Sequence, residues 1–598
     1  MAKFKSWQVC CLLCVGLFCA VALICLCNAL LVNNGCSSGS FQYAAVAADS
    51  QLCSDIGRNM LQQGGSAVDG AIAALLCTSV VNPQSMGLGG GSIFTIRDQT
   101  GKVKVFSARE TAPQAVKANL LNDCPRNLIF ITGSQWIGVP GELRGYEEVH
   151  KMYGRLPWAK LFEPTIKLAR EGFQLPRFLG RLLSFPPIQQ LVKNSALCDL
   201  FCNKNKTLLK EGDILKFPKL AETMETIAEQ GADALYNGKI GLNLIQDIKA
   251  EGGTMKMEDL TSFQVRLEDA WTVPLGNNRM HIPRPPAGGA LLAFILSLMN
   301  GVMSITTLSV LEPSDCNSYI YVASEWVQLV VNVGCHHLSS EFSLSPKSME
   351  GDKRVHTYQR FIEAVKFANG HKRSIRDPVF SNGESAAHLI DSNFIQRVRE
   401  MISINRTHDD SYYNLKPSSD HFGTTHVSVL DKDGFAVSAT STINHIFGAA
   451  IYSKSTGIIL NNELADFCWR SDTVRPGEQP PSSMSPTILE SASGGILVIG
   501  GSGGSMITSA VALSIMNHLW LGMNLRDAIA APIVFVDADN NLNFEPGFDE
   551  FVIEALTDLG HRVKHWKYFF NVVNAVEKKN GCITAISDNR KMGQAAGY

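Results

Sequence analysis

The stretch His421-Phe422-Gly423-Thr424-Thr425-His426-Val427-Ser428-Val429-Leu430 decides how this chain is interpreted. Its alternating residues predict a β-strand, the turn Asp431-Lys432-Asp433-Gly434 follows, and residues 435–442 are the expected return strand of a hairpin. Threonine is common on strands, so these residues alone are also typical of an ordinary β-hairpin with no chemical role.

Cleavage of the chain between Gly423 and Thr424 would give Thr424 a different chemistry. A threonine hydroxyl is a poor nucleophile at neutral pH and needs a base within hydrogen-bond reach. The freed α-amine would titrate near about 7.7–8.0, whereas a lysine would stay protonated. One residue would then supply both the nucleophile and its base.

Two further blocks accompany this stretch. One runs from Thr440-Ser441-Thr442-Ile443-Asn444 to Asn461-Asn462-Glu463-Leu464-Ala465-Asp466, and the other from Pro481-Ser482-Ser483-Met484-Ser485-Pro486-Thr487 to Gly500-Gly501-Ser502-Gly503-Gly504. Together, and in this order, they resemble the γ-glutamyltransferase family, whose members cleave themselves before a threonine. The resemblance extends from about Ala44 to Tyr598.

This resemblance implies an α+β fold, the N-terminal-nucleophile αββα sandwich, with two central sheets between helical layers. A large chain (33–423) and a small chain (424–598) would stay associated after self-cleavage. Cleavage would begin with attack of the Thr424 hydroxyl on the Gly423 carbonyl, and water would hydrolyse the resulting ester.

The resemblance also implies the catalytic residues: Thr424 is the nucleophile, Thr442 orients it, and Gly503 and Gly504 form the oxyanion hole. The local sequence is compatible with such a hole, because a buried strand (496–499), a glycine turn (500–504) and a helix (505–521) would present backbone N–H groups. The same order suits nucleotide binding, but neither a G-x-G-x-x-G pattern nor a P-loop lysine is present. Without the resemblance, Thr442 reads as a strand threonine with a satisfied hydroxyl.

The head of the γ-glutamyl group, in this resemblance, is held by six residues. Carboxylate donors and ammonium ligands are both needed, because a buried zwitterion requires partners for each charge. The donors are Arg109, Ser482 and Ser483, and the ammonium ligands are Glu463 and Asp466 with Asn444 assisting. Unaided, the sequence would make Arg109 a surface ion-pair residue and the two acids a solvated pair.

The composition is that of an ordinary folded protein. The 598 residues are 45% hydrophobic and 18% charged, with a formal charge of −2, so neither intrinsic disorder nor nucleic-acid binding is expected. No cofactor and no metal are expected. The nearest metal candidate is Cys335-His336-His337, and adjacent side chains cannot easily share one ion.

The N-terminus predicts a membrane anchor. Residues 8–32 are almost continuously apolar and follow a short basic tail (1–7), so we expect a single-pass type II plasma-membrane protein with its catalytic part extracellular. A cleaved signal peptide is the alternative. Six of sixteen cysteines lie in the anchor. The family resemblance pairs Cys53 with Cys77 and Cys198 with Cys202, and Asn205 and Asn405 head glycosylation sequons.

Two segments and one residue need separate interpretation. The run 82–92 is rich in glycine but leads into a strand, which favours close backbone packing over phosphate binding. An insertion at about 303–340 interrupts the resemblance. It is a functional loop, a disordered segment, or an unspliced or mispredicted segment, and the sequence leaves these alternatives open. Ile446, expected in the wall of the pocket, stands where well-known members of the family carry a tyrosine, and its side chain cannot donate a hydrogen bond to a lid or an acceptor.

The sequence as a whole therefore predicts an enzyme that takes the γ-glutamyl group from glutathione or its conjugates. Residues 82–91, 525–533 and 569–576 resemble the leukotriene-cleaving branch of the family, so leukotriene C4 is an expected substrate. Water, amino acids or dipeptides would be the acceptors. The alternatives are a non-maturing, inactive membrane-anchored homologue and an amide acylase of the same fold, against which Glu463 and Asp466 argue.

Overall fold

The computed structural model describes residues 36, 39–124, 132–301, 344–381, 386–416, 418, 420, 422–468, 470–564 and 571–598. The expected anchor, the insertion at about 303–340 and the Cys335-His336-His337 triplet lie outside these residues. Within the described part of the chain, no helix is long and apolar enough to cross a membrane.

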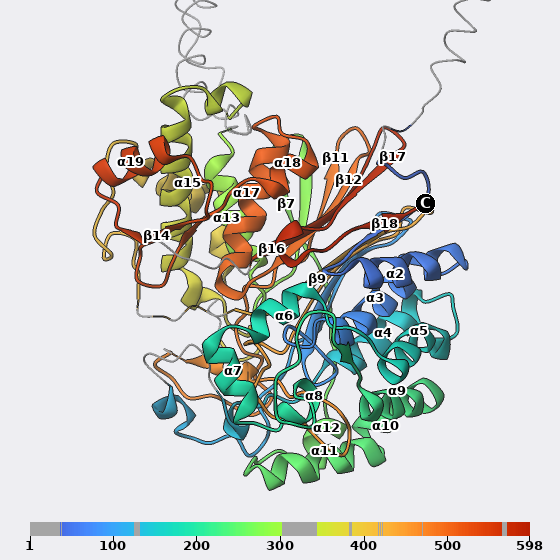
Figure 1. The fold of residues 1–598 in the computed structure, drawn as a ribbon. Helices are drawn as coiled ribbons and strands as arrows, with labels where there is room; N and C mark the ends of the chain where they lie inside the picture. Colours follow the sequence, from blue (N-terminus) through green and yellow to red (C-terminus); the bar gives the residue numbers. More distant parts are fainter. Residues whose placement is uncertain are drawn as a thin grey trace, which may run out of the picture.

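Two antiparallel sheets form the centre of the molecule (Figure 1). The first has seven strands in the order β18 (Ala596–Gly597), β1 (Ala45–Ala47), β9 (Thr425–Leu430), β10 (Ala436–Thr442), β2 (Gly91–Arg97), β3 (Val103–Ala108) and β6 (Arg266–Asp269). The second has six strands in the order β17 (Cys582–Ile586), β16 (Val572–Lys579), β12 (Ile496–Ser502), β11 (Thr487–Ser491), β8 (Asn278–Ile282) and β7 (Trp271–Leu275).

Helices cover the outer face of each sheet, which gives the four layers expected of an αββα sandwich (Figure 1). The seven-stranded sheet is covered by α2 (Gln51–Gln62), α3 (Ala67–Val81) and α4 (Glu142–Tyr153). Outside them, α5 (Trp158–Glu171) packs on α3, and α9 (Pro218–Gln230) packs on α5. The six-stranded sheet is covered by α13 (Gly289–Met299), α17 (Ile507–Leu519) and α18 (Leu525–Ala530). Outside them, α15 (Lys353–Gly370) packs on α13, and α19 (Glu550–Asp558) packs on α15.

Small and aliphatic side chains fill the space between the sheets, among them Ala45, Ala47, Leu430, Val498 and Val576. The helices nearest the sheets are buried on every side: all 15 residues of α3 and all 11 of α13 are buried. A helix surrounded by protein must be apolar all round, which explains the lack of amphipathic pattern in these two segments. Each fully buried Leu or Ile contributes about 1.5–3 kcal/mol of transfer free energy.

Strand register brings the candidate site residues to the same end of four inner strands of the seven-stranded sheet, which are β9, β10, β2 and β3. The β9–β10 pairing sets Thr425 opposite Ser441, so Thr424 comes beside Thr442. Thr442 in turn pairs with Gly91 at the start of β2. Ser92 pairs with Ala108 at the end of β3, immediately before Arg109. Because these pairings are antiparallel, residues far apart in sequence meet at the same end of the paired strands.

The predicted hairpin is confirmed. The Ala- and Leu-rich run 67–81 predicts a deeply buried helix, and α3 confirms it. Two local predictions are wrong. The sequence predicts a strand at 457–460 before the loop of Glu463 and Asp466, but these residues form no strand, and Ile459 and Leu460 make only single bridges to Tyr452 and Gly89. The glycine turn expected at 500–504 starts later, because Gly500–Ser502 still pair with β16. Gly503, at φ +119°, makes the turn into the short 3₁₀ helix η8 (Gly504–Met506).

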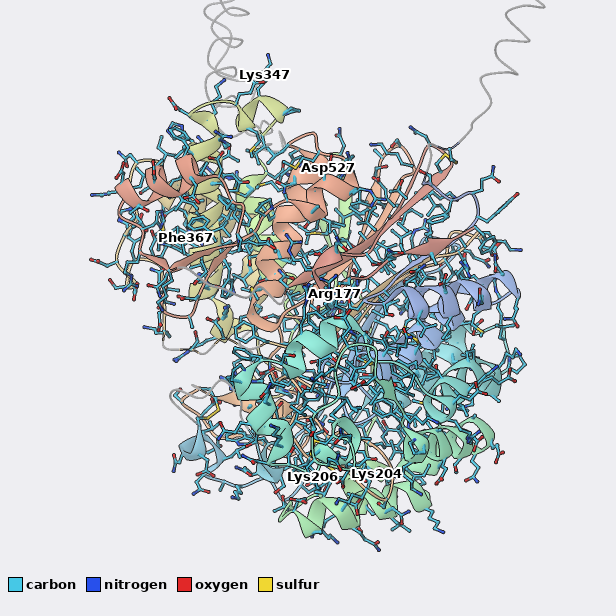
Figure 2. All side chains as sticks on the ribbon, viewed as in Figure 1. Arg177, Lys204, Lys206, Lys347, Phe367 and Asp527 are labelled. Atoms are coloured by element: carbon cyan, nitrogen blue, oxygen red, sulfur yellow. A yellow bond between two sulfur atoms is a disulfide. The ribbon has the colours of Figure 1, made fainter. Side chains whose placement is uncertain are left out.

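Four disulfides join the described cysteines. The expected pairs are present: Cys53–Cys77 links α2 to α3, and Cys198–Cys202 spans α8 (Cys198–Phe201). Cys36–Cys582 and Cys124–Cys468 are additional. Both sequon asparagines are exposed, and Lys204 and Lys206, which flank Asn205 in the sequence, lie in the lower part of the molecule as drawn in Figure 2.

Candidate active site

Thr424 lies immediately before β9 and is buried, with 4% of its surface exposed. Its Oγ1 donates a hydrogen bond to Thr442 Oγ1 at 3.2 Å, and its backbone N–H donates to the Ser85 carbonyl at 3.2 Å. The backbone of Thr424 has φ +79°, a left-handed conformation that is rare for a β-branched residue. Such strain costs on the order of 1–3 kcal/mol and is concentrated at functional sites.

The carbonyl before Thr424 already has a donor. Gly423 O accepts a hydrogen bond from the Gly503 N–H at 3.0 Å, in a chain that is continuous across residues 423 and 424. A donor at this oxygen would stabilise the negative charge that develops when the adjacent carbonyl carbon is attacked. A Cβ at residue 423 would lie 1.8 Å from the Asn444 carbonyl oxygen, so only glycine fits there.

Lys591, which was not among the predicted site residues, donates a hydrogen bond to the backbone of Thr424. Its buried Nζ donates to Thr424 O at 2.7 Å, to Ser502 Oγ at 2.9 Å and to Asp49 Oδ2 at 2.8 Å. Asp49 also accepts from Thr425 Oγ1 at 2.6 Å and from the side chain of Asn574 at 2.8 Å. This network ties Thr424, the predicted nucleophile, to both sheets. The sequence gave Lys591 no role, because its partners lie far away in the chain.

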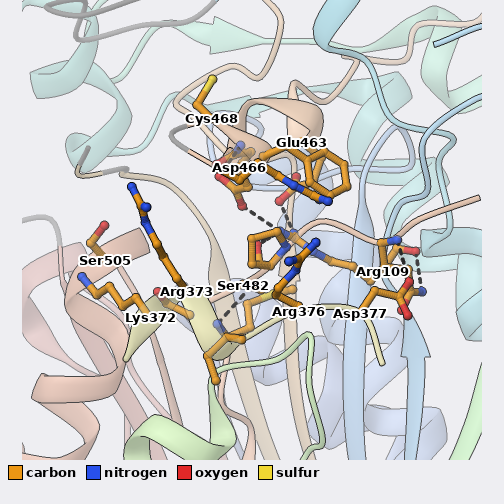
Figure 3. A pocket seen from close by; sticks show the side chains of 18 of the residues that line it. Arg109, Lys372, Arg373, Arg376, Asp377, Glu463, Asp466, Cys468, Ser482 and Ser505 are labelled. Atoms are coloured by element: carbon orange, nitrogen blue, oxygen red, sulfur yellow. Dashed lines mark hydrogen bonds and ion pairs between the residues drawn. The ribbon is translucent and has the colours of Figure 1, made fainter. Parts of the chain in front are cut away.

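Arg109 is fully buried and lies at the centre of a charged cluster (Figure 3). Its guanidinium donates to Glu463, to Asp466 Oδ2 at 2.7 Å, and to the carbonyls of Pro480 and Pro481 at 3.2 and 2.8 Å. The predicted carboxylate donor and the predicted ammonium ligands are therefore in direct contact. A zwitterionic head group could take the place of these internal ion pairs, since it offers each side the opposite charge.

Burial and mutual contact set the ionisation of this cluster. Burial raises the pKa of Glu463, against the lowering effect of the Arg109 charge. Burial likewise raises the pKa of Glu110 to about 8, although Arg109 opposes the shift. Burial alone would lower the pKa of Arg109, but the carboxylates of Glu463, Glu110 and Asp466 raise it above its usual value. Within the described residues, Glu463 Oε2 is buried without a hydrogen-bond partner, which leaves an acceptor for an ammonium group.

Asn444 connects the Arg109 cluster to Thr424, the predicted nucleophile. Its backbone N–H donates to Thr442 Oγ1 at 2.8 Å, and its side-chain Nδ2 donates to Asp466 Oδ1 at 3.0 Å. Thr442 therefore receives hydrogen bonds from both Thr424 and Asn444. These bonds join Asp466, a predicted ammonium ligand, to the predicted nucleophile.

Asn461 positions the ammonium ligands, a role that the sequence block did not reveal. Its side chain accepts from the N–H groups of Gly138 and Glu463, both at 2.9 Å, and donates to the carbonyls of Gly89 and Gly138. Glu463 and Asp466 lie on the 3₁₀ helix η7 (Glu463–Phe467). The glycine run beside it packs closely, as expected: a Cβ at Gly90 would lie 2.0 Å from Thr442 O.

A pocket of about 400 Å³ brings together all the predicted catalytic and substrate-binding residues except Gly503. Those that line it are Arg109, Thr424, Thr442, Asn444, Glu463, Asp466, Ser482, Ser483 and Gly504. Ser482 is held from behind, because its N–H donates to Pro286 O at 2.8 Å and its Oγ accepts from Met484 N at 3.1 Å. Ile446 is buried in the core beneath the seven-stranded sheet and is not a lining residue.

Comparison with known proteins agrees with this geometry. The family model described as Gamma-glutamyltranspeptidase matches residues 53–334 and 321–598, which together span most of the chain. The chain belongs to the γ-glutamyltranspeptidase family. The glutathione hydrolase 5 proenzyme of Rattus norvegicus is 44% identical over 604 residues, covering 98% of each chain. The glutathione hydrolase 5 proenzyme of Homo sapiens is 44% identical over 592 residues, covering 94% of each.

The fold is also shared with a solved structure outside these relatives. The cephalosporin acylase from Bacillus halodurans superposes with a TM-score of 0.77 at 20% identity, covering 94% of this chain and 96% of that one. At this identity the likeness concerns the fold alone. The family membership makes this chain a γ-glutamyl hydrolase or transferase, and glutathione-type molecules are the substrates that it implies.

Proposed function

We propose that this protein cleaves the γ-glutamyl bond of glutathione and of glutathione conjugates such as leukotriene C4, through an ester on Thr424. The observation that carries the proposal is the convergence in one pocket of Thr424 with the Arg109–Glu463–Asp466 cluster, a site for an amino-acid head beside a nucleophile. A plain amide acylase would have no use for this charged cluster. No cofactor takes part.

Maturation uses the geometry of the uncleaved chain. The Thr424 hydroxyl attacks the Gly423 carbonyl carbon, and the Gly503 N–H stabilises the oxygen that it already contacts at 3.0 Å. The peptide C–N bond breaks as the nitrogen takes a proton, which leaves an ester on the Thr424 oxygen and a free amine on the same residue. Water then hydrolyses the ester, giving a Gly423 carboxylate and restoring the Thr424 hydroxyl.

In turnover, the new α-amine accepts the hydroxyl proton while the oxygen attacks the γ-carbonyl carbon of the substrate. The Gly503 N–H, released from Gly423, and the adjacent Gly504 N–H stabilise the oxyanion. The amine of the leaving peptide takes the proton as the C–N bond breaks. Water, an amino acid or a dipeptide then attacks the γ-glutamyl ester and releases Thr424.

The proposed location is the outer face of the plasma membrane, with residues 8–32 as a type II anchor. The support is the apolar N-terminal stretch after a basic tail, together with four disulfides in the described part of the chain, which are typical of oxidising compartments. Exposed Asn205 and Asn405 agree with glycosylation there.

The test is N-terminal sequencing of the purified ectodomain combined with an assay of glutamate release from glutathione and leukotriene C4. We expect two chains, the smaller beginning Thr-Thr-His-Val, and release of glutamate from both substrates. Thr424→Ala should abolish cleavage and activity together. An active wild-type protein that remains one uncut chain, or a Thr424→Ala variant that matures, would overturn the proposal.

A further inference from the structure

Residues 372–377 form a second wall of the pocket, away from the Arg109 cluster. Lys372, Arg373, Ile375, Arg376 and Asp377 all line it. Figure 3 shows Lys372 and Arg373 with Ser505 on one side of the pocket, apart from the Arg109, Glu463 and Asp466 group. Four of these five side chains are ionisable, and they differ in whether another side chain of the protein forms an ion pair with them.

The acidic groups near this wall are satisfied by other residues. Asp377 is bound by both terminal nitrogens of Arg266, at 2.6 and 2.8 Å, and accepts from the Gln479 N–H at 2.9 Å. Asp472 is shared by Arg470 and Arg376. These carboxylates are therefore neutralised within the protein.

Lys372 differs from Asp377 and Asp472 in having no ion-pair partner among the described residues. Among the described residues, its Nζ has no hydrogen bond and no ion pair, although it lines the pocket. Burial lowers the pKa of Lys372, and the more distant carboxylates of Asp420 and Asp537 only partly oppose that shift. A partly buried ammonium without a direct partner is costly, so an arriving anion would improve its environment.

The reaction geometry says which part of a substrate would meet it. The γ-carbonyl must lie at Thr424 and the Gly503 N–H, and the amino-acid head at Arg109, Glu463 and Asp466. The rest of the substrate, beyond the scissile bond, must extend toward another part of the pocket. The leaving peptide of glutathione ends in a carboxylate.

We propose that Lys372 binds the C-terminal carboxylate of the leaving peptide and so selects γ-glutamyl substrates with an anionic leaving group. This inference rests on the proposed function, whose substrate class it narrows. Lys372 is in this assignment a specificity residue, not a participant in bond breaking. The binding is a charge-assisted hydrogen bond from the ammonium to a carboxylate oxygen.

The test compares two substrates that differ in one charge: glutathione and its C-terminal amide. The kcat/KM for glutamate release is measured for wild type, Lys372→Met, Lys372→Arg and a control, Lys347→Met, which removes a lysine on the exposed helix η4 (Pro346–Met349) that does not line the pocket (Figure 2). We expect Lys372→Met to lower the glutathione-to-amide ratio about fivefold or more. Lys372→Arg should keep most of the ratio, and Lys347→Met all of it.

An unchanged ratio in Lys372→Met, with wild type active on both substrates, would overturn the role of Lys372 and leave the proposed function standing. Wild-type protein that releases glutamate from neither substrate would overturn the proposed function and the Lys372 assignment with it. A ratio that falls equally in Lys347→Met would show a general effect of net charge, which also contradicts the assignment.

A separate inference comes from the disulfides. Cys36–Cys582 and Cys124–Cys468 each join a residue before the Gly423–Thr424 bond to one after it, whereas Cys53–Cys77 and Cys198–Cys202 lie wholly before it. Cys468 lines the pocket and lies two residues after Asp466. We infer that the two chains of the matured protein are covalently joined by these disulfides. One of them, Cys124–Cys468, fastens the segment that carries Glu463 and Asp466 to the large chain.

This inference is tested on thiol-blocked, matured protein by denaturing gel electrophoresis with and without reductant. We expect one species without reductant and two with it. Cys36→Ser and Cys124→Ser should each keep one joining bond and still run as one species, whereas the double variant should separate. Wild-type chains that separate without reductant would overturn the inference, while one chain even with reductant would show instead that cleavage, and with it the proposed function, had failed.

Discussion

Replacing Gly423 by alanine should block maturation. A Cβ at residue 423 would lie 1.8 Å from Asn444 O, a distance that packed atoms do not reach. The backbones of Gly423 and Asn444 must therefore separate by about 1 Å or more before the side chain fits. Asn444 cannot move freely, because its N–H is bonded to Thr442 Oγ1 and its side chain to Asp466.

Most of this displacement must come from residue 423 itself, which carries the carbonyl to be attacked. The 3.0 Å bond from the Gly503 N–H to Gly423 O would lengthen, and the Thr424 hydroxyl would lose its alignment with the carbonyl carbon. A misplacement of about 1 Å can cost on the order of 100-fold in rate, or about 2.7 kcal/mol of barrier. Overpacking should lower folding stability by about 1–3 kcal/mol.

The assay is a time course of self-cleavage of the purified precursor, followed on reducing gels, with circular dichroism to establish that the variant is folded. Gly87→Ala is the matched control, since it lies in the neighbouring glycine run, has no atom within 4 Å of the added Cβ and has no positive φ. We expect Gly87→Ala to mature like wild type. A folded Gly423→Ala variant that is cleaved at the wild-type rate would refute the steric argument.

Three buried ionisable residues give further expectations, best measured by denaturant unfolding in the uncleaved Thr424→Ala background. Arg109→Met leaves its carboxylate partners uncompensated and should cost about 3–5 kcal/mol; a loss under 1 kcal/mol would contradict it. Burial raises the pKa of Glu142 to about 8, so its contribution is full below about pH 4.5 and is lost as pH rises through 8. Glu142→Gln should therefore flatten the fall in stability by about 1.4 kcal/mol per pH unit between pH 5 and 7.5, and an unchanged slope would show that Glu142 ionises normally. Lys591→Met removes three buried hydrogen bonds and should lower stability by about 3–5 kcal/mol, whereas a neutral effect would show that the network is dispensable.

The sequence by itself determined the features that depend on nearby residues. The strand–turn–strand pattern around Asp431-Lys432-Asp433-Gly434 predicted the hairpin, and the apolar run 67–81 predicted a buried helix. The family blocks placed Thr424, Thr442, Arg109, Glu463 and Asp466 in one site, and the pocket contains all of them. The alternating pattern and the turn were sufficient for the hairpin, the continuous apolar run for the buried helix, and family resemblance for the site.

Only the tertiary structure decided which distant groups meet. Lys591 reaches Asp49 across 542 positions, and Cys36 reaches Cys582 across 546. Strand pairing also overrode a local signal, because β16 holds Gly500–Ser502 in the sheet and moves the turn to Gly503. The physical reason is that the partners of a buried charge, a thiol or a strand end are set by sheet register and layer packing, and neighbouring residues in the chain do not specify either.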